Sequence, residues 1–365
     1  MTVRKSYVAG AALVSCAATL GFAKWSGRHK LTEVYRNEHF RLTGISVSKT
    51  SRLFVNFPRW SDNYLNAVIE VMPDGSEKPF PDKYWNGWDL KPATAGKQFV
   101  CVQSVVVDDT DALWVLDPAA PLLTSPVPGG PKLVEIDLKT DKVSRIIHFE
   151  PDVVLPDSYL NDVRFDTRRG TAYITDSGHG GIVVLDLATS KAHRALDADR
   201  SVMAEQGVQV IVNGKPVLFN GKPPMFNSDG IALSPDGEYL YYKPVTAVPL
   251  YRIKTEVLRE KNASPATVAP AVEKVAATFP TDGLWMDSNN RLYLSDVNHN
   301  AVVRLSPKGK METVVEDPRL QWPDTFSEGP DGSIYISASH INESPTYNEG
   351  ISARTQPYGV FKLKP

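Results

Sequence analysis

The stretch SVVVDDTDALWVLD, residues 104–117, decides the fold. Apolar and polar residues alternate up to an Asp-rich turn, and the alternation resumes around Trp114, which is typical of a β-hairpin. The pattern recurs five more times, each time with an aromatic residue in the second strand. The other copies are GISVSKTSRLFVNF (44–57), DVRFDTRRGTAYITD (162–176), GIALSPDGEYLYY (230–242), GLWMDSNNRLYLSD (283–296) and DTFSEGPDGSIYIS (324–337). Six hairpins of one kind indicate a repeat architecture.

A further strand and turn follow most of the copies, as in KLVEIDLKTDKVSRIIHF at 132–149. Four strands in each repeat are typical of a propeller blade, because one blade cannot bury both of its faces alone. The sequence therefore predicts an all-β, six-bladed β-propeller of four antiparallel strands per blade over residues 31–365. Only one clear strand, YGVFKLKP at 358–365, follows the last copy. We expect residues 31–36, LTEVYR, to complete the sixth blade and join the two ends of the chain.

The 365 residues carry a formal charge of −2 with no basic stripe, which argues against a nucleic-acid partner. The N-terminal residues 1–23 differ from the rest, since Arg4 and Lys5 precede the apolar run YVAGAALVSCAATLGFA. This pattern predicts a signal peptide or an N-terminal membrane anchor. LVSC at 13–16 resembles a lipobox, in which Cys16 would be lipidated. The expected location is secreted or periplasmic, with membrane attachment only through this segment.

Strand direction assigns the loops to faces. The start of each innermost strand and the link between the second and third strands share one face of the ring. Polar residues stand at the starts of the innermost strands and are expected to converge on the ring axis, where they could bind a ligand or a hard cation such as calcium. In the alternative interpretation, the Asp-Gly pairs among them are turns. The six positions are Thr43, Gln103, Asn161, Asp229, Asp282 and Asp324.

The links between second and third strands supply further candidates on the same face. Arg59 and Trp60 lie in FPRWSDN, and His340 lies in SASHIN, all predicted as ligand-binding residues. His179 and His299 each follow a strand-ending Asp by three residues and are candidate general acids or bases. Each of the histidines could equally be a solvated loop residue.

Several segments in order resemble the major royal jelly and Yellow protein family: FPRW at 57–60, VQSVVVDDTDALWVLDPA at 102–119, PKLVEIDLKTDKVSRIIHF at 131–149, LNDVRFD with AYITDSG, DGIALSPDGEYLYY, and LQWPDTF at 320–326. The resemblance runs from about Phe54 to the C-terminus. It implies a secreted six-bladed propeller. Members of this family differ in function: some are similar to dopachrome-converting enzymes, some bind biogenic amines in the channel, and others serve as nutrient or signalling proteins.

A more distant resemblance is to the gluconolactonase and regucalcin group of metal-dependent lactonases. It implies a divalent metal held by Asn161, Asp229 and Asp282, with Asp282 as general base. The metal-binding Glu of that group is missing, because Thr43 and Gly44 occupy its place.

Two hypotheses remain open. In the first, the protein is an exported, monomeric binding protein whose channel accepts a small molecule, with Asp229, Asp282 and Asp324 as counter-charges. In the second, the same channel belongs to an enzyme, either a lactone hydrolase that uses a metal and Asp282, or a dopachrome-type isomerase that uses His179 or His299. The missing Glu favours the binding protein.

Overall fold

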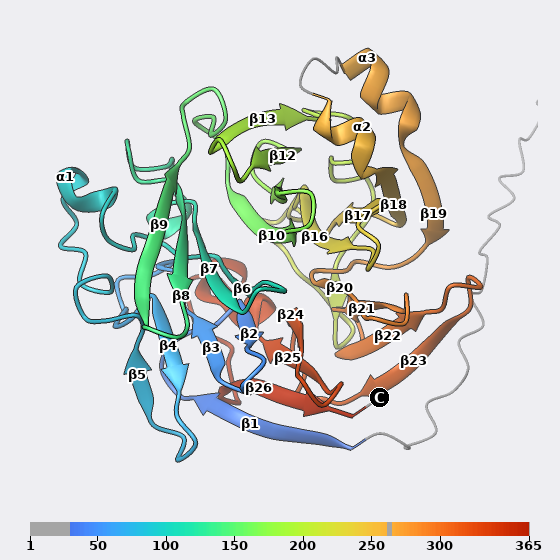
Figure 1. The fold of residues 1–365 in the computed structure, drawn as a ribbon. Helices are drawn as coiled ribbons and strands as arrows, with labels where there is room; N and C mark the ends of the chain where they lie inside the picture. Colours follow the sequence, from blue (N-terminus) through green and yellow to red (C-terminus); the bar gives the residue numbers. More distant parts are fainter. Residues whose placement is uncertain (1–29, 261–264, 365) are drawn as a thin grey trace, which may run out of the picture.

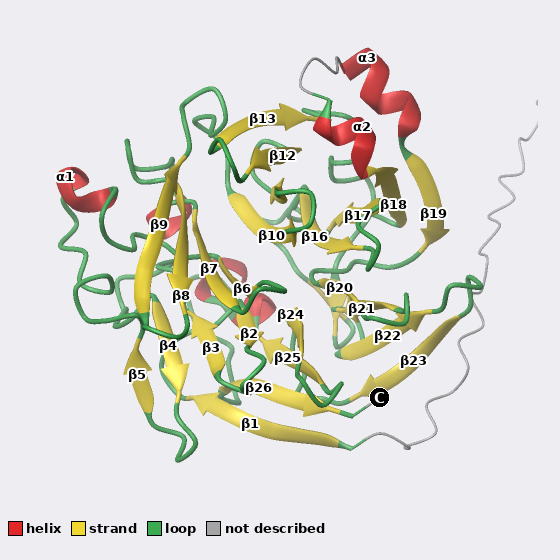
Figure 2. Cartoon of the chain, in the orientation of Figure 1, coloured by secondary structure: helices red, strands yellow, loops and turns green. Residues whose placement is uncertain are grey.

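The computed structural model describes residues 30–260 and 265–364 as a ring of six four-stranded antiparallel sheets (Figures 1 and 2). The predicted six-bladed propeller is confirmed. Blade 1 consists of β2 (Ile45–Val47), β3 (Leu53–Asn56), β4 (Val68–Val71) and β5 (Glu77–Pro79). Blade 2 consists of β6 (Ser104–Val107), β7 (Ala112–Asp117), β8 (Lys132–Asp137) and β9 (Lys142–His148). Blade 3 consists of β10 (Leu160–Asp166), β11 (Thr171–Asp176), β12 (Gly181–Asp186) and β13 (Lys191–Ala195).

Blades 4 and 5 follow the same order along the chain. Blade 4 consists of β16 (Ser228–Leu233), β17 (Tyr239–Pro244), β18 (Pro249–Lys254) and β19 (Glu273–Ala277). Blade 5 consists of β20 (Leu284–Met286), β21 (Leu292–Asp296), β22 (Ala301–Leu305) and β23 (Met311–Glu316). The loops within the described residues also contain short elements. These are the hairpin of β14 (Ile211–Val212) and β15 (Lys215–Pro216), the helices α1 (Pro92–Ala95), α2 (Thr255–Arg259) and α3 (Pro265–Val268), and four 3-10 helices. In the described chain, no helix has the length and apolar character needed to cross a bilayer.

The sixth blade joins the two ends of the described chain. It consists of β24 (Pro323–Glu328), β25 (Ile334–Ala338), β26 (Tyr358–Leu363) and, as the outermost strand, β1 (Leu31–Asn37). Leu31 pairs with Leu363 and Asn37 pairs with Tyr358 (Figure 1). The expected closure by the N-terminal strand is therefore confirmed. The predicted signal or anchor segment, residues 1–23 with Cys16, lies outside the described residues.

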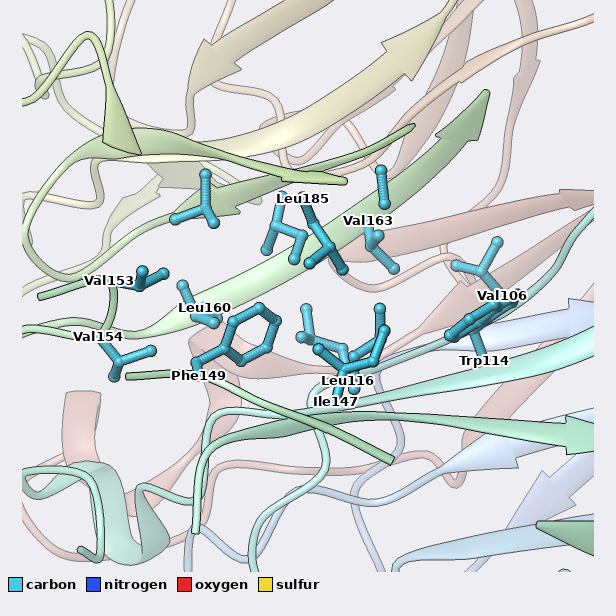
Figure 3. Packing of buried hydrophobic residues seen from close by; sticks show 14 residues of the cluster. Val106, Trp114, Leu116, Ile147, Phe149, Val153, Val154, Leu160, Val163 and Leu185 are labelled. Carbon is cyan, nitrogen blue, oxygen red and sulfur yellow. The ribbon is translucent and has the colours of Figure 1, made fainter. Parts of the chain in front are cut away.

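The hydrophobic core lies between the blades. Six clusters of buried side chains each combine residues from two neighbouring blades, and each pair of neighbours around the ring has one. Between blades 2 and 3, for example, Val106 and Trp114 pack with Leu160 and Val163 (Figure 3). A single blade cannot bury these faces, so the ring is stabilised as a whole.

Glycines allow the innermost strands to approach one another closely. A Cβ on Gly230 would lie 2.3 Å from the carbonyl oxygen of Asp282, and one on Gly283 would lie 1.7 Å from that of Asp324. Neither glycine has a positive φ. The Asp-Gly pairs at 229–230 and 282–283 are thus not turns. Each glycine makes room for the backbone of the next blade, which carries the next aspartate.

Candidate functional site

A cavity of about 840 Å³ occupies the channel on the face that carries the links between second and third strands. Its volume lies in the range usual for sites that bind small organic molecules. Six of the residues predicted from the sequence line it: Trp60, Gln103, Asn161, Asp229, Asp282 and Asp324. The structure thus brings together five of the six predicted strand-start residues. Their role in binding stays a prediction.

A directed chain of hydrogen bonds runs along one side of this cavity. Trp60 Nε1 donates to Tyr159 OH (2.6 Å), which donates to Gln103 Oε1 (2.9 Å). Gln103 Nε2 then donates to Asn161 Oδ1 (3.3 Å), and Asn161 Nδ2 donates to Asp229 Oδ2 (2.7 Å). An indole N–H can only donate, so Tyr159 OH accepts the first bond of the chain. At the other end of the chain, Asn161 presents its amide nitrogen to Asp229.

Three carboxyl groups form the inner end of the cavity. Burial raises the pKa of Asp229 well above its usual range, and the charges of Asp282 and Asp324 raise it further. Burial also raises the pKa of Asp282, to about 6, although hydrogen bonds from Trp322 and Asp229 oppose the shift. The pKa of Asp324 is raised mainly by burial and next by the charge of Asp282. Asp229 and Asp282 thus share a hydrogen bond, and both burial and the neighbouring negative charges disfavour the ionised form of Asp229.

Arg164 closes the channel beneath these carboxyl groups. Its Nη1 lies 2.9 Å from Asp162 Oδ1, and its Nη2 donates to the carbonyl oxygen of Leu284 (2.9 Å). Arg164 belongs to blade 3 and Leu284 to blade 5, so the guanidinium reaches past blade 4. On the other side of Arg164 lies a separate cavity of about 330 Å³ that shares no lining residue with the first. The main cavity therefore has a closed inner end.

Three predicted binding residues lie behind the cavity wall. Thr43 is fully buried, and its hydroxyl donates to the carbonyl oxygen of Gln103 (3.1 Å). Arg59 stacks on Tyr64, with Cζ 3.9 Å from the ring centroid. His340 is buried, and its Nδ1 lies 2.8 Å from Glu343 Oε2. None of the three is among the residues that line the cavity.

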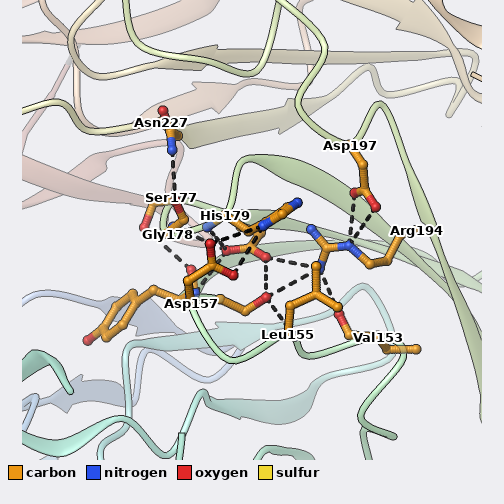
Figure 4. Close-up of polar contacts among 12 residues, drawn as sticks. Val153, Leu155, Asp157, Ser177, Gly178, His179, Arg194, Asp197 and Asn227 are labelled. Atoms are coloured by element: carbon orange, nitrogen blue, oxygen red, sulfur yellow. Dashed lines mark hydrogen bonds and ion pairs between the residues drawn. The ribbon is translucent and has the colours of Figure 1, made fainter. Parts of the chain in front are cut away.

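The two candidate acid–base histidines also lie outside the cavity. His179 Nδ1 lies 3.1 Å from Asp157 Oδ1 in the loop network of Figure 4. His299 Nδ1 lies 2.8 Å from Asp296 Oδ2, and this side chain borders a different surface pocket. The hydrogen bond to Asp296 raises the pKa of His299. The Asp-x-x-His spacing thus closes a local turn at each position, without bringing the two imidazoles to the channel.

Sequence reasoning missed several residues of the cavity wall. Trp322 donates its indole N–H to Asp282 Oδ2 (2.5 Å), and its φ of 53° is rare for a bulky residue. The carbonyl oxygen of Trp322 accepts bonds from the backbone and hydroxyl of Ser339, which hold this conformation. The one sequence feature that could have identified Trp322 as a cavity residue is its position two residues before Asp324. Other missed lining residues are His39, Arg41, Tyr64, Tyr159, Phe226, Tyr347, Arg354 and Tyr358.

The predicted metal ligands do not fit a divalent cation. Calcium needs six to eight oxygen ligands. The oxygen of Asn161 accepts from Gln103, while Asp229 and Asp282 bond to each other and to neighbouring N–H groups. No group of three or more His, Cys, Asp or Glu residues within 30–260 and 265–364 is placed to hold a metal ion.

The described residues thus form a six-bladed propeller with a cavity of about 840 Å³ in its channel. The family model of the major royal jelly proteins matches residues 100–341. The chain therefore belongs to the major royal jelly protein family. Major royal jelly protein 1 of Apis mellifera is 25% identical over 222 residues, which cover 57% of this chain and 49% of that protein. The alignments with the curated relatives span 35% to 54% of their length.

Solved structures share the ring at low sequence identity. A calcium-binding protein, regucalcin, from Agrobacterium tumefaciens is 16% identical with a TM-score of 0.56, and 92% of this chain covers 93% of it. A gluconolactonase from Xanthomonas campestris is 13% identical with a TM-score of 0.55, and 92% of this chain covers 90% of it. At such identities these likenesses show the fold alone.

Proposed function

We propose that this protein is an exported binding protein that holds a small organic cation with an aromatic or apolar body in the channel cavity. One observation carries the proposal. Asp229, Asp282 and Asp324 are buried at the closed end of the cavity, and no described Lys, Arg or His forms an ion pair with them. A buried carboxylate without a counter-charge is costly, so a bound cation would be stabilised there.

The walls of the cavity suit the rest of such a ligand. Aromatic side chains can pack against an apolar body and attract a cation through their ring faces. The aromatic lining residues are Phe40, Phe57, Trp60, Tyr64, Tyr159, Phe226, Trp322, Tyr347 and Tyr358.

The export part of the proposal rests on the N-terminal apolar run and on membership of a family named after royal jelly.

Phenethylamine and 2-phenylethanol test the charge, because they share one body and differ in the cationic group. Calorimetry on the wild type is expected to show binding of the amine and much weaker binding of the alcohol. Asp282→Asn keeps the acceptor for Trp322 and removes the charge, so the amine should bind at least about tenfold more weakly. Asp74→Asn, in an exposed turn, is the matched control and should bind like the wild type. Equal binding of amine and alcohol would contradict the proposal.

The metal-dependent alternative has its own test. Because the donors already bond to one another, calcium and EDTA are each expected to change the melting temperature of the wild type by less than about 1 °C. Differential scanning fluorimetry with calcium after EDTA measures this directly. A calcium-dependent rise of several degrees that Asp282→Asn abolishes would restore the hydrolase hypothesis.

A further inference from the structure

Two guanidinium groups line the cavity away from the carboxyl cluster. Arg41 and Arg354 both contact the ring of Tyr358, with Cζ 5.7 Å and 4.6 Å from its centroid. Their hydrogen bonds go to backbone carbonyl oxygens, that of His340 for Arg41 and those of Gln356 and Glu38 for Arg354. Within the described ranges, neither arginine forms an ion pair with a carboxylate. Two positive charges therefore border the cavity without an anionic partner.

Arg41 also has an unused donor. Its Nε is buried and has no hydrogen-bond partner among the described residues. A buried donor that makes no hydrogen bond loses its hydration without compensation, so it favours an acceptor that reaches it. Buried guanidinium nitrogens of Arg59, Arg164 and Arg194 also lack a partner among the described residues, but none of these three side chains lines the cavity. The guanidinium of Arg52, by contrast, pairs with both carboxylate oxygens of Glu70.

Aromatic rings connect the two charged regions. The indole of Trp322 bonds to Asp282 at the inner end, and its ring centroid lies 6.4 Å from that of Phe226. The ring centroid of Phe226 lies 6.3 Å from that of Tyr347. Burial raises the pKa of Tyr347 to about 12, and the positive charge of Arg41 acts against this rise. The cavity thus runs from carboxyl groups, past an apolar wall, to arginines.

We propose that the ligand is amphoteric, with a cationic group against Asp229, Asp282 and Asp324, an apolar body along Trp322 and Phe226, and a carboxylate or similar anionic group bound by Arg41 and Arg354. The inference rests on the proposed function and adds the second charge. Guanidinium groups bind carboxylates through paired N–H donors. A ligand with both charges at opposite ends satisfies each end of the cavity with one molecule.

Three probes separate the contributions of the two ends: 4-(2-aminoethyl)benzoate carries both charges, phenethylamine only the cation, and 4-ethylbenzoate only the anion. Calorimetry on the wild type is expected to show that 4-(2-aminoethyl)benzoate binds at least about tenfold more tightly than either other probe. Arg41→Met/Arg354→Met should remove this advantage without weakening the binding of phenethylamine, since the two lost charges repel a cation. Arg41→Lys/Arg354→Lys, which keeps the charge, should retain part of it. Arg252→Met is the control, since Arg252 stacks on Tyr239 outside the cavity.

The outcomes distinguish this inference from the function on which it rests. Equal affinities of phenethylamine and 4-(2-aminoethyl)benzoate for the wild type would overturn the second charge and leave cation binding intact. Binding of 4-ethylbenzoate as tight as that of 4-(2-aminoethyl)benzoate would overturn the role of the carboxyl groups. Binding of none of the three probes would overturn both proposals. A melting temperature like that of the wild type shows that each arginine variant is folded.

Discussion

Lys132→Met is expected to lower the free energy of unfolding by about 3–5 kcal/mol, because it leaves a fully buried carboxylate without its counter-charge. Lys132 Nζ lies 2.7 Å from Asp117 Oδ2, and neither side chain is exposed. The same Nζ donates to the carbonyl oxygens of Ala95 (2.9 Å) and Gly130 (3.0 Å). Burial lowers the pKa of Lys132, while the charge of Asp117 opposes that shift.

Urea denaturation followed by tryptophan fluorescence measures this loss. Lys142→Met is the matched control, since Lys142 is exposed on β9 of the same blade, and we expect a change of less than about 0.5 kcal/mol. A loss below about 1 kcal/mol for Lys132→Met would show that the pair contributes little to stability.

Arg164→Met is expected to have an effect of similar size, about 3–5 kcal/mol, for a related reason. The variant leaves Asp162 buried without a cation and breaks the link from blade 3 to the backbone of blade 5. Arg168→Met, in the exposed turn that follows β10, is the control and should unfold like the wild type. Equilibrium unfolding of the two variants under identical conditions gives the comparison.

Arg164→Met also tests the closed end of the channel. With the guanidinium removed, the buried charge of Asp162 adds to that of the neighbouring carboxyl cluster. Phenethylamine should then bind the folded variant at least as tightly as the wild type. An unchanged free energy of unfolding for Arg164→Met would show that Arg164 neither neutralises Asp162 nor ties the two blades together.

The fold could be predicted from the sequence because each blade repeats a period-two pattern with one aromatic marker. The strand-start residues Gln103, Asn161, Asp229, Asp282 and Asp324 could be placed together for the same reason, since repeats put equivalent positions in register around one axis. The closure by β1 followed from counting strands. All of these inferences depend on periodicity, which can be read from a single sequence without homologues.

The loop contributions could not be predicted in this way. Arg41, Trp322 and Arg354 reach the cavity from irregular segments whose side-chain directions follow no period. His179 and His299 lie outside the cavity for a different reason: the Asp-x-x-His spacing resembles a catalytic pair, but here the Asp accepts the backbone N–H of the His and closes a local turn. The role of the Asp-Gly pairs could not be decided from the sequence, because it depends on a contact with the neighbouring blade that the sequence of one repeat does not show.

The pairing of β1 with β26 links the fold to the order of synthesis. The first described strand finds its partner only when the chain has been made as far as Leu363. Until then, a growing chain can hold five blades and an incomplete sixth, with the backbone donors and acceptors of β1 unpaired. The contact that closes the ring is thus the last one that synthesis makes possible, and a chain that stops before β26 leaves β1 without its partner strand.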